Sequence, residues 1–275
     1  MNEEFCRAAV ACAVALLAGV AQAQEAKSPW EKASIQLGVL DTHSDTEMRI
    51  DSETLGVGAV VNVEDALGVD SNKRTYRIDA LYRPGSTHRH QWDVAYFDSR
   101  RSGDKVLEEE IQVGDTVFPL GAAVSSEFNL RFLNVNYSYA FFQDERVRLS
   151  AAVGLHVTGV ELKVKSPGLA LFEDESFTAP LPVVGMRGEV LLTQSWRLKG
   201  SMDVFYLRYD NVEGALVDSL VAVEYLPFKN VGFGLGVNTV RLTARADGNN
   251  SARVDLNGEV TFTLGGAMLY VKGYF

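Results

Sequence analysis

Residues 146–159 read RVRLSAAVGLHVTG, and their side chains alternate between two kinds. Every second residue from Val147 to Val157 is apolar, and the residues between them include Arg148, Gly154 and His156. Successive side chains of a β-strand point to opposite faces, so this stretch predicts a strand with one apolar and one polar face. Its apolar stripe has the length that a tilted transmembrane strand needs, about 9–11 residues.

The same alternation recurs along the chain and predicts ten strands. The expected ranges are 33–50, 73–83, 88–101, 126–142, 146–163, 179–193, 195–209, 214–226, 230–244 and 252–275. Twelve strands are the alternative if the chain turns at GGA, residues 265–267, and if its first long segment is split. Eight strands are a further alternative. An even number places both termini at the same end of the sheet.

The connections between these strands alternate in length. The segments RPGST, FFQDER, TQS and PFKN are short and turn-like. The links 53–72, 102–124, 165–176 and 246–251 are longer, and they carry the acidic runs LEEE and FEDESF. Short turns at one end and long loops at the other are typical of outer-membrane barrels. We therefore expect both acidic runs in outer loops.

A soluble β-sandwich would also show alternating strands. Two features favour a barrel in a membrane instead. Aromatic residues gather at the ends of the apolar stripes, in YSYAFF, FYLRY, LYRP and SWR, as they do in the interfacial girdles of such barrels. The polar faces are charged yet rich in glycine and alanine, which suits a lumen. The fold expected is all-β, a closed antiparallel transmembrane up-and-down barrel.

The chain ends on LYVKGYF, residues 269–275, with Leu269, Val271 and Phe275 on one face. This tail resembles the C-terminal signature of bacterial outer-membrane β-barrel proteins. The resemblance covers the whole chain in architecture and points to no subfamily. It implies that the barrel-assembly machinery reads the last strand and that this strand pairs with the first one, which leaves the sheet without a free edge.

The last predicted strand changes phase near GGA. Val260, Phe262 and Leu264 are out of step with the apolar residues of the tail. Either a β-bulge at Gly265–Gly266 or a turn that adds a strand would account for this change.

Residues 1–23 have the pattern of a signal peptide. The apolar run AAVACAVALLAGV precedes AQA, whose small residues Ala21 and Ala23 fit an export peptidase. The expected domains are a signal peptide, 1–23, and an outer-membrane barrel domain, 24–275. Without residues 1–23, 25 basic residues stand against 34 acidic ones, a net charge of −9, which argues against a nucleic-acid partner. Both cysteines, Cys6 and Cys12, lie in the signal peptide.

No constellation in the sequence indicates catalysis, a cofactor or a metal site. Omptin-type outer-membrane proteases pair an Asp-x-Asp with a later Asp-x-His. Here Asp41 and His43 stand in the first predicted strand, and no Asp-x-Asp follows them. His88 and His90 share a strand face, but we expect them at the periplasmic membrane interface rather than on a metal. An enzyme that hydrolyses lipid or peptide stays the alternative reading.

The leading expectation is a non-enzymatic outer-membrane barrel, either a narrow channel or a plugged structural or adhesive barrel. A lumen of ten strands has little space, and its charged side chains come in both signs and can pair. Expected partners are outer-membrane lipid, lipopolysaccharide and the assembly machinery. The polar side chains expected to face the lumen are Arg77, Asp79, Arg83, Arg89, Asp93, Arg148, His156, Arg187, Glu189, Arg197, Lys199, Asp203 and Glu224.

Overall fold

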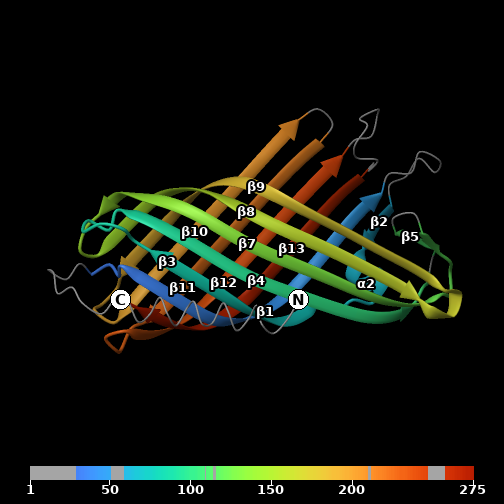
Figure 1. The fold of residues 1–275 in the computed structure, drawn as a ribbon, viewed down its shortest axis with the longest axis horizontal. Coiled ribbons are helices and arrows are strands. Elements are labelled where there is room, and N and C mark those ends of the chain that lie inside the picture. Colours follow the sequence, from blue (N-terminus) through green and yellow to red (C-terminus); the bar gives the residue numbers. More distant parts are fainter. Residues whose placement is uncertain (1–28, 51–58, 109, 114–115, 210–211, 247–257) are drawn as a thin grey trace.

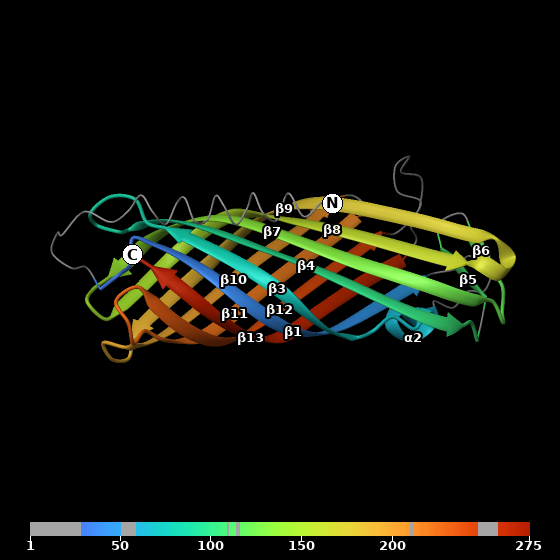
Figure 2. The same cartoon turned by 60° about the horizontal axis from the view of Figure 1, so that its bottom comes forward.

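Ten antiparallel strands close into a barrel (Figures 1 and 2). The computed structural model describes residues 29–50, 59–108, 110–113, 116–209, 212–246 and 258–275. The predicted fold class and ten-strand count are confirmed within these ranges, and counts of eight and twelve are wrong. In ring order the strands are β1 (Ala33–Ile50), β3 (Asn72–Tyr82), β4 (His90–Val106), β7 (Ala123–Gln143), β8 (Val147–Ser166), β9 (Leu171–Leu191), β10 (Trp196–Tyr209), β11 (Val212–Tyr225), β12 (Val231–Ala246) and β13 (Gly258–Tyr274).

The first and last strands close the ring. β1 pairs with β13 from Ser34 opposite Tyr274 to Ile50 opposite Gly258. At its end, Lys32 N donates to Phe275 O at 2.7 Å, and Phe275 N donates to Ala33 O at 2.9 Å. The terminal phenylalanine is therefore held through its backbone by the start of the first strand.

Neither reading of the GGA segment is correct. β13 pairs with β1 and with β12 in an unbroken register across Gly265 and Gly266, so it holds neither a bulge nor a turn. The phase changes because Phe262 and Leu264 point into the barrel, where they are buried, while Leu269 points outward. The register shift that the structure does contain lies on β7, between Ala140 and Phe142.

The two ends of the barrel differ. The turn end carries the four short connections, 83–89, 144–146, 192–195 and 226–230, together with Lys32 and Phe275. The loop end carries the other connections. Among its described elements are β2 (Ala59–Asn62), the helix α2 (Val63–Leu67) and the hairpin of β5 (Ile111–Val113) and β6 (Thr116–Phe118). No helix in the described ranges is long and apolar enough to cross a membrane.

One predicted outer loop is instead part of a long hairpin. β8 continues to Ser166, β9 begins at Leu171, and only the 3-10 turn η1 (Pro167–Leu169) lies between them. The acidic run FEDESF therefore lies on β9, because strand pairing continues almost to the hairpin tip. The run LEEE does fall in a connection, between β4 and β5, although Glu109 is outside the described residues. The expected loop 246–251 and the proposed signal peptide also fall outside them, apart from Ala246, which ends β12.

A belt of exposed apolar side chains surrounds the barrel, here called the lipid belt. On β8 it comprises Leu149, Val153 and Leu155, which are 36%, 57% and 41% exposed, whereas Arg148 and His156 on the opposite face are buried. Exposed aromatic residues edge the belt. Those toward the turn end are Tyr82, Trp92, Tyr139, Trp196, Tyr225 and Phe228, and those toward the loop end are Tyr76, Tyr96 and Tyr206. Such a belt between two aromatic girdles is the surface that a membrane barrel presents to lipid.

The barrel is flattened, so that opposite walls touch inside it. Figure 1 shows β4, β7, β8 and β9 crossing β10 to β13 at a large angle. Near the loop end the interior is apolar, and the rings of Phe132 on β7 and Phe262 on β13 stack with centroids 6.4 Å apart. The two walls pack there like the sheets of a sandwich.

Candidate functional site

The interior near the turn end is filled by ion pairs around Glu31, here called the Glu31 cluster. Residues 29–32 precede β1 and enter this end of the barrel. Glu31 Oε1 accepts from Lys272 Nζ at 2.7 Å, and Glu31 Oε2 accepts from Arg197 and lies 3.4 Å from Arg83 Nη1. Arg83 also bonds Glu189 on the far wall. Glu31, its three partners and Glu189 are all buried, so their charges interact strongly.

Glu31 is held in its charged form by these neighbours. Burial alone would raise the pKa of Glu31, but the positive charges of Lys272, Arg197 and Arg83 outweigh it and hold the pKa well below its usual range. The adjacent Trp30 is 2% exposed and donates its indole N–H to Asp144 O at 3.0 Å. Residues 29–32 thus form a short plug at the turn end.

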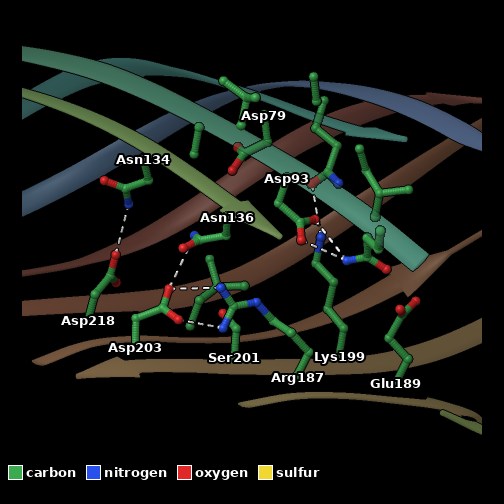
Figure 3. Close-up of a pocket in the computed structure, with 18 of the residues that line it drawn as sticks. Asp79, Asp93, Asn134, Asn136, Arg187, Glu189, Lys199, Ser201, Asp203 and Asp218 are labelled. Carbon is green, nitrogen blue, oxygen red and sulfur yellow. Dashed lines mark hydrogen bonds and ion pairs between the residues drawn. The ribbon is translucent and has the colours of Figure 1, made fainter. Parts of the chain in front are cut away.

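A polar layer in the middle of the barrel joins both neighbouring and distant strands (Figure 3). Arg187 on β9 donates to both carboxylate oxygens of Asp203 on β10, at 2.6 and 2.9 Å. His156 Nε2 on β8 lies 3.3 Å from Asp203 Oδ2. Asn134 on β7 donates to Asp218 Oδ2 on β11 at 3.1 Å. These contacts tie the β7–β8 wall to the β10–β11 wall.

A second chain of bonds in this layer runs from β3 to β12. Arg77 donates to Asp79 at 2.9–3.0 Å and to Asn238 Oδ1 at 3.0 Å. Asn238 in turn donates to Asp218 at 2.8 Å. The layer therefore holds two hydrogen-bonded groups, one around Asp218 and one around Asp203, and the His156 ring lies between the two carboxylates.

A cavity of about 110 Å³ lies within this polar layer. It can hold several water molecules, since one water needs about 10–15 Å³ of such space. The Oδ1 atoms of Asn134 and Asn136, which line it, are buried and have no protein partner. Ordered water is the ligand that such orphaned acceptors usually have.

Charges in the turn-end half and middle of the interior balance. Seven acidic side chains face seven basic ones. The acidic side chains are Glu31, Asp79, Asp93, Glu189, Asp203, Asp218 and Glu224, and the basic ones are Arg77, Arg83, Arg148, Arg187, Arg197, Lys199 and Lys272. A balanced interior has no net field to select ions of one sign.

The interior near the loop end is apolar and covered by α2. Leu67, the last residue of this helix, and Val69, which follows it, pack with Phe97 and Phe128 in the barrel core. Glu64 fixes the helix, because it accepts from Arg101 NH1 and from the N–H and hydroxyl of Thr46, each at 2.8 Å. Burial acts to raise the pKa of Glu64, but the bonds from Arg101 and Thr46 outweigh it and lower the pKa.

The side chains that the sequence analysis placed in the lumen lie in these layers, with one exception. Twelve of them are buried or half-buried and face the interior. Arg89 is in the turn before β4, where its guanidinium donates to Ala140 O at 3.2 Å. The tail residues Leu269 and Val271 are exposed in the lipid belt, and Phe275 is half-buried at the closing seam.

Two histidines outside the lumen contact side chains on a neighbouring strand. Asp41 and His43 point outward from β1, and His43 Nδ1 lies 3.0 Å from Asn72 Oδ1. His90 contacts Tyr137 and Tyr139 at the turn-end girdle. Among the described residues, no group of three or more histidine, cysteine or acidic side chains could hold a metal ion.

Several interior residues were missed by sequence reasoning. Glu31 precedes the first strand, so strand alternation gives it no direction. Asp218 and Lys272 do follow the inward period of β11 and β13, and that period could have found them. Glu64 and Arg101 could not be paired, because their contact depends on how α2 folds back over the barrel.

Comparison with known proteins identifies the fold. No family model matches the sequence, and no curated protein is similar to it. Among solved structures, the outer-membrane protease OmpT of Escherichia coli superposes with a TM-score of 0.54 at 10% identity, over 92% of this chain and 99% of that one. The chain has the fold of a bacterial outer-membrane β-barrel.

Two further structures are similar over most of their length. The translocator domain of the autotransporter NalP from Neisseria meningitidis has a TM-score of 0.47 at 10% identity, over 99% of this chain and 96% of that one. Neisserial surface protein A has a TM-score of 0.35 at 14% identity, over 89% and 97%. At such identities the likeness concerns the fold alone.

Proposed function

We propose that this chain is a sealed, non-enzymatic outer-membrane barrel with a structural or surface-presenting role. The observation that carries the proposal is the contact between opposite walls at every level of the interior. Arg83 bonds Glu189 near the turn end, Asn134 bonds Asp218 in the middle, and Phe132 stacks on Phe262 near the loop end. Side chains that bond across a lumen occupy the path that a solute would need.

The surface that such a barrel offers is its extended wall. β7, β8 and β9 are 20 or 21 residues long, whereas β10 and β11 have 14. About 9–11 residues cross the bilayer, so the remainder of these strands rises beyond the lipid belt. Polar and charged outward side chains there, including Arg131 and Lys163, favour contact with water, lipid headgroups or a partner.

The enzymatic alternative has less support in the described residues. The outward pair Asp41 and His43 has Arg74 and Asn72 as neighbours, not a second acidic pair. A hydrolase of this class would need a nucleophile or an activated water beside its base. We propose that the chain is exported through the periplasm, as the pattern of residues 1–23 suggests, and that the assembly machinery recognises its tail. We also propose that it contacts lipopolysaccharide, as an outer-membrane location implies.

Conductance of the refolded protein in planar bilayers tests the proposal. The wild type should give no channel steps, and lipid and peptide hydrolysis measured on the same sample should stay at background. A variant combining Trp30→Ala and Glu31→Ala with Asn134→Ala, Phe132→Ser and Phe262→Ser should conduct, because each of the three levels then loses side chains that block the lumen. Its matched control, Phe141→Ser on the lipid face, should stay silent. Stable channel steps from the wild type would refute the sealed lumen. Hydrolysis of lipid or peptide above background would favour the enzymatic alternative.

A further inference from the structure

The wall of the barrel has a notch between β9 and β10. These strands pair from Leu191 opposite Arg197 only as far as Val184 opposite Val204. β9 continues to Leu171 while paired with β8 alone, and β10 continues to Tyr209 while paired with β11 alone. In Figure 1 the loop ends of β9 and β10 point in different directions and lie well apart. Within the described residues, both strands have an unpaired edge toward the notch.

Two prolines stand where the pairing stops. Pro180 and Pro182 lie directly beyond Val184 on β9, and proline has no N–H to donate to a neighbouring strand. β8 pairs past both prolines without a shift of register, so the missing donors belong to the edge that faces β10. The two prolines thus prevent β9 and β10 from pairing further, and they remove backbone N–H donors that would be left unpaired.

The floor of the notch is the point where the pairing of β9 and β10 stops, at Val184 and Val204, and it lies inside the lipid belt. On β8, Val153 stands opposite Val184, and the same face continues toward the loop end with the exposed Leu155 opposite Pro182 and the half-buried Val157 opposite Pro180. The step of four residues from Val153 to Val157 spans about 13 Å along the strand, which is about 9 Å of membrane depth for a strand tilted by 45°. At that depth water is not available, and the neighbouring molecules are lipids.

The notch also exposes the apolar interior of the loop-end half. Leu207 on β10 continues the inward series of Asp203 and Phe205, yet it is 54% exposed. Beside it, Phe205 and, on β9, Leu181 are half-buried and pack against the barrel core. Leu207 follows Tyr206 of the loop-end girdle, so an apolar side chain of inward direction remains exposed at the edge of the lipid belt, where lipid can reach the core.

We propose that the notch between β9 and β10 is a docking site for an acyl chain of an outer-leaflet lipid. The chain lies between the two unpaired edges and contacts Phe205 and Leu207 from the side. Continuity with the lipid belt identifies the occupant, because lipid surrounds both flanks of the notch. The proposal rests on the belt and on strand pairing, and it does not require a sealed lumen.

Quenching of a fluorescent label by brominated acyl chains tests this site. Cys6→Ser and Cys12→Ser remove the only cysteines of the chain, and single cysteines then carry bimane. Leu207→Cys is the test position. Met202→Cys, outward on the same strand and 50% exposed, is the lipid-facing control, and Leu242→Cys, inward and half-buried on β12, is the interior control. The protein is refolded into vesicles of phosphatidylcholine with brominated chains.

We expect quenching at 207 of at least half the level at 202, and little at 242. Restoring the donors with Pro180→Thr and Pro182→Thr should lower quenching at 207 by about twofold or more, because the seam can then pair further. Equal quenching at 207 and 242 would overturn the proposal. The proposal would also be overturned if chemical cross-linking captured a dimer in which the label at 207 is protected from the brominated chains. That result would show that a second copy of the chain occupies the notch. Quenching that the proline replacements leave unchanged would overturn the role given to these prolines.

Discussion

The ring of Phe132 stacks on the ring of Phe262 although their strands, β7 and β13, stand four places apart in the ten-strand ring. A contact of this kind exists only where the barrel wall is pressed flat. It makes the loop-end half of the lumen an apolar core instead of a water-filled passage.

Replacing Phe262 with alanine should destabilise the barrel by about 3–5 kcal/mol, the usual cost of removing a buried aromatic side chain. The matched control is Phe141→Ala, because Phe141 is 52% exposed on the lipid face and should cost much less. Urea unfolding of the refolded proteins, followed by tryptophan fluorescence, measures both. Similar losses for the two variants would contradict an apolar core.

Glu31→Gln should destabilise the turn end by about 3–5 kcal/mol, because it leaves buried cations without a counter-charge. Glu145→Gln in the exposed turn before β8 is the control and should be nearly neutral. The same urea titration reports both. A neutral effect of Glu31→Gln would show that Glu224 and Glu189 are sufficient to balance Lys272 and Arg197.

Gly154→Ala should be poorly tolerated, because a Cβ there would lie 1.8 Å from Asn136 Oδ1 and 2.6 Å from the backbone oxygen of Val135. Overpacking of this kind costs about 1–3 kcal/mol. Gly188→Ala is the matched change on β9, where a Cβ would meet only Leu149 at 3.7 Å. The ratio of folded to unfolded bands on unheated gels checks the ranking, and the reverse order would refute this packing.

Stability should depend on pH through Glu64. Its pKa is lowered in the folded protein, so its charged form stabilises α2 above the unfolded pKa, and this contribution is lost as the pH falls through the folded pKa. The thermal midpoint of the wild type should therefore exceed that of Glu64→Gln at pH 6 and approach it near pH 3. A difference between the two proteins that stays constant over this range would rule out Glu64 as the source.

Deleting Phe275 should hinder assembly and leave export intact. The deletion removes the acceptor of Lys32 N and the donor to Ala33 O, and with them the last backbone contacts of the closing seam. The heat-modifiable folded form should fall several-fold in outer-membrane fractions while the periplasmic precursor accumulates. Normal levels of the folded form would show that the closing strand is recognised without its last residue.

The fold was predictable from segments such as 146–159, since lipid on one side and a polar interior on the other force a period of two. The same rule failed at Phe262 and Leu264. There an apolar interior replaced the polar one that the rule assumes, and the change was misread as a bulge or a turn. Partners across the lumen, such as Asn134 with Asp218, could not be derived from the sequence. These contacts depend on how the closed barrel flattens, and the residue pattern of an individual strand carries no information about that shape.

The contact between Glu31 and Lys272 also imposes an order of events. It joins residues 241 positions apart, and closing so long a loop in a disordered chain costs about 5 kcal/mol of entropy. Hairpins between neighbouring strands shorten that loop, so they form first and the ring closes last. A chain delivered from its N-terminus therefore cannot seal itself before residue 275 arrives. Until then, each partial sheet exposes two unpaired strand edges, which are sites where another chain can pair and aggregate.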